Sequence, residues 1–143
     1  MSNQFVRRPR NRTMVVANPG AGNDAIFTVP AGVEWEIVSG YFEITTSAVT
    51  GEASALIFGY SATSDTMWQY KSPYLIGPGA TVAYGLLTGS GYLQSAIAKA
   101  ESIAIPPLRL MPGDEIYYSW ANPAGTVTVT FPALCVRETI LGY

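Results

Sequence analysis

The sequence predicts an all-β protein, an antiparallel β-sandwich or jelly roll of about eight to ten short strands. Three observations support this class: apolar and polar residues alternate in several segments, proline and glycine turns recur between them, and only one segment has helical spacing. The 143 residues are enough for one domain with its own core. We therefore assign residues 14–143 to a single β-sandwich domain and residues 1–13 to an extended N-terminal arm.

The arm is distinguished by its charge. It contains Arg7, Arg8, Arg10 and Arg12, and the first acidic residue of the chain is Asp24. The rest of the chain has four basic and ten acidic residues, a net charge of −6. We expect the four arginines to bind an acidic surface of a neighbouring subunit or another protein, and deletion of residues 2–12 to leave folding intact but weaken assembly. Nucleic acid is an unlikely partner, because four arginines on an acidic body form a small electrostatic footprint.

The clearest strand signals are segments in which every second residue is apolar. These segments are residues 33–37, 116–120, 126–131 and 134–140, and Glu138 interrupts the apolar face of the last one. Beyond Gly40 the apolar positions shift to Phe42 and Ile44, which predicts a bulge or bend near the glycine. Weaker strand signals cover residues 14–17, 25–29, 53–60, 66–70, 81–87 and 103–105, and residues 92–101 are the single helix candidate.

The turns between these segments have a common composition. Residues 29–32, 77–79 and 111–114 each place a proline shortly before a glycine and precede a predicted strand. Proline presets φ near −65°, and glycine accepts the positive φ that follows in such turns. These glycines are therefore expected to serve the fold and not catalysis.

The composition argues against common catalytic and metal-binding chemistry. The chain has no histidine and a single cysteine, Cys135, which removes histidine-based acid–base catalysis, disulfide frameworks and Cys/His metal clusters. Glu34 and Glu36 are two residues apart on one predicted strand face, a separation of about 7 Å that could suit paired carboxylates. Solvent-facing glutamates are the simpler interpretation. We expect no enzymatic activity, no metal and no cofactor.

Aromatic residues are concentrated in residues 59–74 among serine, threonine, glycine and proline. Tyr60, Trp68, Tyr70 and Tyr74 form a candidate partner-binding surface or, for the last three, a platform on which sugars could stack. A lid packed over one end of the sandwich is the alternative.

Charge is sparse in the predicted domain. Residues 72–98 and 116–136 contain no charged side chain, but glycines, prolines and alternating threonines argue against a membrane span in either stretch. Polar residues also interrupt the region behind the arginines, where a secretory signal would need an apolar stretch, so we expect folding in a cytoplasm. The uncharged stretches indicate either a Ser/Thr/Gly surface over a two-sheet core or surfaces covered by subunit contacts.

Several segments together resemble small β-sandwich virion proteins of tailed bacteriophages. The resemblance covers roughly residues 28–131 and rests on residues 28–32 leading into 35–37, on residues 45–48 with Gly51 and Leu56, and on residues 105–108 with Leu110 and 112–114. Such proteins include capsid decoration (cement) proteins and accessory head, neck or tail components. The resemblance implies no catalysis, and the arginine arm is not part of the matched pattern.

The functional expectation is therefore a structural virion protein, made in the host cytoplasm, that decorates and stabilises the major capsid protein lattice. The expected partners are the major capsid protein or other virion proteins, and a homo-oligomer, with a trimer favoured. The alternatives are a neck or tail ring component and a carbohydrate-binding module that uses Trp68, Tyr70 and Tyr74.

Overall fold

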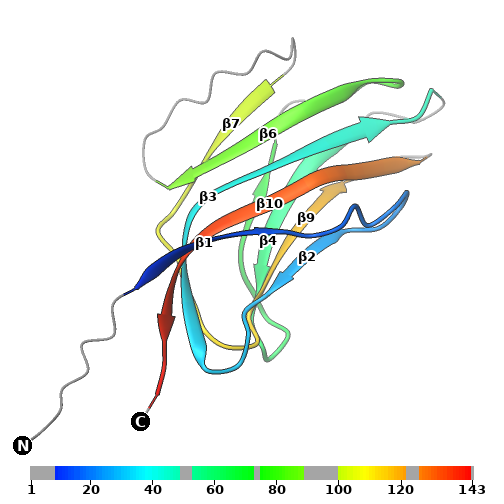
Figure 1. The fold of residues 1–143 in the computed structure, drawn as a ribbon. Helices are drawn as coiled ribbons and strands as arrows, with labels where there is room; N and C mark the ends of the chain where they lie inside the picture. The colour runs from blue at the N-terminus through cyan, green and yellow to red at the C-terminus, as the bar shows by residue number, and fades with distance from the viewer. Residues whose placement is uncertain (1–8, 49–52, 73–74, 89–99, 122–125, 143) are drawn as a thin grey trace, which may run out of the picture.

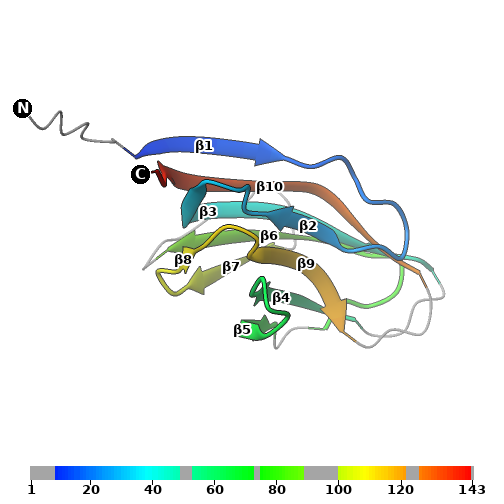
Figure 2. The same ribbon diagram turned by 90° about the horizontal axis from the view of Figure 1, so that it is seen from below.

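The computed structural model describes residues 9–48, 53–72, 75–88, 100–121 and 126–142, and these residues form two β-sheets packed face to face (Figures 1 and 2). Sheet A has six strands, with the order β1 (Arg10–Val15), β10 (Val127–Ile140), β3 (Val33–Thr46), β6 (Thr81–Thr88) and β7 (Ala100–Ile105), and with β8 (Arg109–Leu110) paired to β3. Sheet B has four strands, in the order β2 (Ala25–Thr28), β9 (Glu115–Ala121), β4 (Ser54–Tyr60) and β5 (Thr66–Lys71). The predicted all-β sandwich is confirmed.

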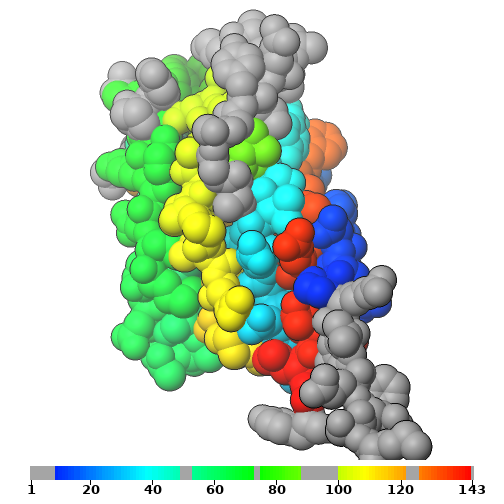
Figure 3. All heavy atoms as spheres, turned by 90° about the vertical axis from the view of Figure 1, so that its left-hand side faces the viewer, coloured from blue at the N-terminus to red at the C-terminus, as the bar shows by residue number. Residues whose placement is uncertain are grey.

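Strand pairing follows a nested order along the chain. β1 pairs with β10, β2 with β9, β3 with β6, and β4 with β5, so that each pair encloses the next in sequence. The outermost pair joins the two ends of the described chain. Figure 3 shows this side of the fold, with β1 in blue against β10 in red and orange, and β10 against β3 in cyan.

Two predicted features of the strands need correction. The pair β6 and β7 is parallel, whereas the sequence predicted an antiparallel sandwich. Parallel neighbours require a long crossover connection, and alternation along one strand gives no information on the direction of the next. Of the helix candidate 92–101, Ala100 and Glu101 lie in β7, and residues 92–99 lie outside the described residues.

The last two predicted strands, residues 126–131 and 134–140, merge into one continuous strand, β10, of 14 residues. The register with β3 shifts between Thr130 and Ala133 and again between Cys135 and Val136, and Phe131 has a positive φ of 52°. These irregularities allow the strand to continue while its apolar face changes from odd to even residue numbers. On β3, the predicted bulge lies at Val38, two residues before Gly40.

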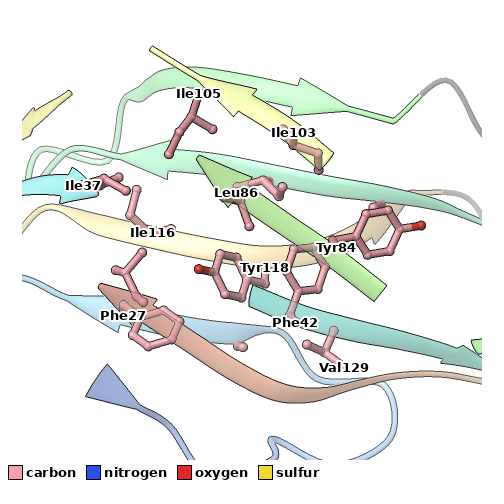
Figure 4. Close-up of a cluster of buried hydrophobic side chains, with 14 of the residues drawn as sticks. Phe27, Ile37, Phe42, Tyr84, Leu86, Ile103, Ile105, Ile116, Tyr118 and Val129 are labelled. Carbon is pink, nitrogen blue, oxygen red and sulfur yellow. The ribbon is translucent and has the colours of Figure 1, made fainter. Parts of the chain in front are cut away.

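The core lies between the sheets and is centred on stacked aromatic side chains (Figure 4). Tyr118 of β9 lies between Phe27 of β2 and Phe42 of β3, with ring centroids 5.3 and 4.5 Å away, and Phe42 also stacks on Tyr84 of β6 at 5.0 Å. Each such pair contributes about 0.5–1.5 kcal/mol beyond the area that it buries. The Tyr118 hydroxyl donates a 2.9 Å hydrogen bond to the Ala133 carbonyl, and burial raises the pKa of Tyr118 well above its ordinary value.

The turn at residues 111–114 shows why the sequence has glycine and aspartate there. Gly113 has a φ of +87°, and the Asp114 backbone N–H donates to the Met111 carbonyl at 3.0 Å, which closes the turn. The Asp114 carboxylate accepts hydrogen bonds from the backbone N–H groups of Met111 at 2.8 Å and Ala62 at 3.0 Å. This side chain therefore connects the turn before β9 to the loop between β4 and β5. The geometry agrees with the expectation that Gly113 serves the fold.

The boundary of the predicted arm is wrong. Residues 10–13 belong to β1, which pairs with β10 in register from Arg10 opposite Glu138 to Val15 opposite Ala133. The sheet therefore begins four residues earlier than the expected domain start at Met14. The arginines concealed the strand, because positive charge on a sheet edge resembles a solvated tail in sequence.

Candidate interaction surfaces

The arginines of β1 meet a buried carboxylate at one end of the sandwich. Arg10, Glu138 and Trp35 lie in one row across β1, β10 and β3, and directly opposed residues of antiparallel strands point to the same face. Glu138 is a charged residue, but it is only 1% exposed because it lies on the apolar, core-facing side of β10. In the sequence, Glu138 interrupts this apolar face, but the sequence analysis did not assign it to a site.

Five hydrogen bonds from three side chains reach the two oxygens of the Glu138 carboxylate. Arg10 donates from Nη2 at 3.0 Å and Nε at 3.3 Å to Oε1, and Arg12 donates from Nη1 at 3.1 Å to Oε2 and 3.4 Å to Oε1. The indole Nε1 of Trp35 donates to Oε2 at 3.0 Å. Charge and hydrogen bonds thus compensate for the removal of this carboxylate from water.

The environment of Glu138 acts on its pKa in two directions. Burial by itself raises the pKa, but the hydrogen bonds from Trp35 and Arg10 and the positive charge and hydrogen bond of Arg12 outweigh it. The pKa therefore lies below its ordinary value, and the group stays ionised near neutral pH.

This geometry gives two arm residues a role within their own chain. Arg10 and Arg12 were expected to bind a neighbouring subunit, and they bind Glu138 of their own chain. Their side chains are still 63% and 46% exposed, so part of each guanidinium faces solvent. Arg7 and Arg8 lie outside the described residues.

The four predicted aromatic residues do not form one surface. Trp68 and Tyr70 of β5 lie directly opposite Gly59 and Ile57 of β4, and they pack against the core. Trp68 covers Gly59, where a Cβ atom would lie 2.9 Å from its Cδ1, and Trp68 Nε1 is buried without a hydrogen-bond partner. Both side chains are partly buried against the core. Tyr60 lies on the opposite face of sheet B, and Tyr74 lies outside the described residues.

Tyr70 instead helps to close one edge of the sandwich. Its hydroxyl donates to Oε1 of Glu101 on β7 at 2.8 Å, and the Ser72 hydroxyl donates to Oε2 of the same carboxylate at 2.6 Å. Burial, followed by the charge of Glu101 and the proximity of Tyr70, raises the pKa of the neighbouring Tyr84 far above its ordinary value. Glu101 thus connects β7, the edge of sheet A, to β5, the edge of sheet B.

The surface of sheet B that faces away from the core carries a group of apolar and aromatic side chains. We define the sheet B outer face by the alternate residues that oppose the core-facing ones: Asp24, Ile26, Thr28, Leu56, Phe58, Tyr60, Thr66, Gln69, Lys71, Glu115, Tyr117 and Ser119. Ile26 is 40% exposed although it is a large apolar residue. Exposed apolar groups on a sheet face are typical of surfaces that contact another protein.

Three aromatic rings occupy the centre of this face. Phe58 stacks on Tyr117 with a centroid distance of 4.6 Å and an interplanar angle of 11°, and Tyr60 lies 6.0 Å from each ring. Burial, the charge of Glu115 and its hydrogen bond, and then Asp24 and Tyr60 raise the pKa of Tyr117. The Tyr117 hydroxyl donates to Glu115 Oε2 at 3.4 Å, and the Ser119 hydroxyl donates to Asp24 Oδ1 at 2.6 Å.

Sequence reasoning missed Phe58 and Tyr117 as members of this surface. The signal was present in the sequence. Consecutive residues of a strand point to opposite faces, so Phe58 and Tyr117 point away from the core when their neighbours Ile57 and Tyr118 are buried in it. A search for aromatic density along the chain selected residues 59–74 instead. The surface depends on which strands are neighbours, and the sequence does not give that.

The glutamates considered as a catalytic pair lie on the surface of sheet A that faces away from the core. Glu34 Oε1 lies 3.5 Å from Arg109 Nε, and Glu36 is exposed beside a shallow surface pocket formed with Pro107, Leu108 and Arg109. Within the described parts of the chain, no group of three or more His, Cys, Asp or Glu residues is arranged to hold a metal ion. The described residues also include no helix long and apolar enough to cross a membrane.

Comparison with known proteins gives little further information. No protein-family model and no curated protein matches the chain. One solved structure that aligns with it is a chain in the crystal structure of the T13 IBDV viral particle, with 11% sequence identity and a TM-score of 0.41. The alignment covers 94% of this chain but 36% of the other, so this chain spans about a third of the length of that protein.

Proposed function

We propose that the protein is a structural component of a virus particle, specifically a decoration protein that binds the major capsid protein lattice of a tailed bacteriophage. The observation that carries the proposal is the sheet B outer face, where Ile26, Phe58, Tyr60 and Tyr117 form an apolar surface on a rigid sheet. A rigid sandwich with an exposed apolar face is suited to binding other subunits. The sequence resemblance to small virion proteins supports the setting.

The winding of the strands is a second support. With β7 and β8 set aside, the order β1–β10–β3–β6 in one sheet and β2–β9–β4–β5 in the other supports a jelly-roll winding, in which a long antiparallel ribbon is wrapped into two sheets. Jelly rolls occur in viral capsid proteins and in lectins. We favour the capsid role, because Trp68 and Tyr70, two of the three residues proposed for sugar stacking, pack partly against the core. The proposed role is non-catalytic.

The experiment that tests this proposal is localisation of the protein in virus particles. Particles are purified from the lysate in which the chain is produced, and mass spectrometry and immunogold electron microscopy detect the protein. Regular labelling over the head supports decoration of the capsid lattice. Labelling confined to the neck or tail would instead support the ring component, and absence from purified particles would exclude both virion roles.

A further inference from the structure

We propose that the sheet B outer face is a self-complementary surface that binds a second copy of this chain about a two-fold axis parallel to its strands. The inference concerns the same face that carries the proposed virion role, so a second copy of this chain and the capsid lattice would compete for it. It rests on the positions of charged and aromatic side chains, which the register of the four strands defines. An isologous interface requires that each group on the surface meet a suitable partner on the same surface of the other copy.

The register arranges the sheet B outer face in three rows, each crossing β2, β9, β4 and β5 in that order. Asp24 extends β2 by one residue and contacts Ser119 through the 2.6 Å hydrogen bond. The rows are Asp24–Ser119–Leu56–Lys71, Ile26–Tyr117–Phe58–Gln69 and Thr28–Glu115–Tyr60–Thr66. Each row therefore has defined members at its two ends and at its centre.

The first row carries opposite charges at its two ends. A two-fold axis parallel to the strands, between β9 and β4, places β2 of one copy over β5 of the other and keeps the rows aligned. Asp24 then faces Lys71 of the second copy, and the same pair forms a second time by symmetry. Charge complementarity thus favours this orientation.

The central residues of the other two rows match in the same orientation, and Ile26 at one end of the second row faces Gln69 of the second copy. Tyr117 faces Phe58 of the second copy, and by symmetry Phe58 faces Tyr117 of the second copy. These two contacts bring four aromatic rings together at the centre of the interface. Glu115 faces Tyr60 of the second copy, where a phenol hydroxyl can donate to the carboxylate. Protein interfaces usually have aromatic residues at their centre and charged groups near their border.

The size of the face indicates a reversible complex. Four strands at about 4.8 Å spacing and seven residues at about 3.3 Å give a face of roughly 19 by 23 Å. The two copies together would bury on the order of 900 Å², which is below the range of about 1,200–2,000 Å² for stable complexes. We therefore expect concentration-dependent association with a Kd near the micromolar range, and a dimer in place of the trimer favoured from sequence.

The first test measures the mass of the full-length chain by sedimentation over a range of concentrations, with two matched variants. Ile26→Lys places a charge on the sheet B outer face, and Val38→Lys is the control on sheet A, because the two side chains are 40% and 38% exposed. We expect wild type and Val38→Lys to form dimers and Ile26→Lys to associate at least tenfold more weakly. A wild type that remains monomeric, or a dimer unaffected by Ile26→Lys, would overturn the proposal.

The second test uses charge reversal to identify the orientation. Asp24→Lys and Lys71→Glu each place like charges opposite one another, so each variant alone should associate about tenfold more weakly than wild type. Mixing the two variants restores both opposite-charge pairs, so we expect a heterodimer to form only in the mixture. Native mass spectrometry detects this species. Failure of the mixture to associate, with both variants folded by circular dichroism, would exclude the proposed axis.

Discussion

Glu138 is the residue whose carboxylate we expect to set the stability of the sandwich near β1. It has 1% of its surface exposed and receives hydrogen bonds from Trp35, Arg10 and Arg12. A buried ion pair is weak evidence for stability as such, but loss of one partner is costly because the other partners lose their compensation. The site therefore makes stability depend on the ionisation of one group.

Glu138→Gln should lower the free energy of unfolding by about 2 kcal/mol at neutral pH, because the neutral amide loses the charge-assisted bonds to two arginines. Since the folded pKa lies below the ordinary value of 4.5, the contribution of Glu138 is present above that pH and is lost as pH falls through the folded pKa. Urea unfolding at several acidic pH values measures both effects.

The matched control for that experiment is Glu36→Gln, which changes an exposed glutamate on β3. It should leave both stability and its acid dependence almost unchanged. Equal acid sensitivity of the wild type and Glu138→Gln would show that the carboxylate does not set the stability of this end.

Gly40 of β3 provides a second test at the level of single residues. A Cβ atom there would collide with the Tyr118 hydroxyl, which donates to Ala133. Gly40→Ala should cost about 2 kcal/mol, because the buried ring must move or lose its hydrogen bond. In a Tyr118→Phe background, where the hydroxyl is absent, the same change should cost less. Thermal unfolding of the four proteins completes the cycle, and an additive result would contradict the contact.

At the level of elements, β1 is held to the sandwich by one neighbour and one ion cluster. Its backbone pairs with β10 alone in the described strand order, and four of its side chains from Arg10 to Thr13 are exposed. Met14 packs partly against the core. The contribution of β1 to stability therefore comes mainly from the strand pairing and from the arginines that reach Glu138.

Two N-terminal truncations separate the described strand from the residues that precede it. Deletion of residues 2–8 should leave the free energy of unfolding within about 0.5 kcal/mol of wild type, because β1 and its arginines remain. Deletion of residues 2–12 removes Arg10 and Arg12 and should cost about 3 kcal/mol or more. This reverses the sequence-based expectation that the longer deletion leaves folding intact.

Urea unfolding of the two truncated proteins gives the measurement, and hydrogen exchange of β10 amides shows where protection is lost. The longer deletion should expose amides of β10 that face β1. Equal stability of the two proteins would mean that β1 contributes little and that Arg10 and Arg12 are free to bind other partners.

At the level of the whole molecule, the nested pairing makes the ends of the described chain meet. β1 and β10 pair over sequence separations of more than a hundred residues, as for Arg10 and Glu138, and β2 and β9 come next. Such long-range contacts require loop closure before they are stabilised, and sandwiches with this property fold in milliseconds to seconds. We expect refolding in that range, measured by stopped-flow tryptophan fluorescence, and a microsecond phase that accounts for the full signal would contradict it.

Sequence alone determined the fold class, the apolar faces of most strands and the Pro-Gly turns. These features are local, because side-chain period and turn chemistry depend on neighbouring residues. Even the anomaly at Glu138 was visible as a carboxylate on an apolar face.

Tertiary structure decided which strands are neighbours, and with that the position of every surface described above. The pairing of β1 with β10 places Arg10 and Arg12, two arginines of the expected arm, in ion pairs with Glu138. Pairing β4 with β5 and β9 turned Trp68 and Tyr70 inward and brought Phe58 and Tyr117 together on the outside. The physical reason is that strand alternation fixes only two opposite faces, whereas long-range pairing selects which face meets the core and which side chains become neighbours.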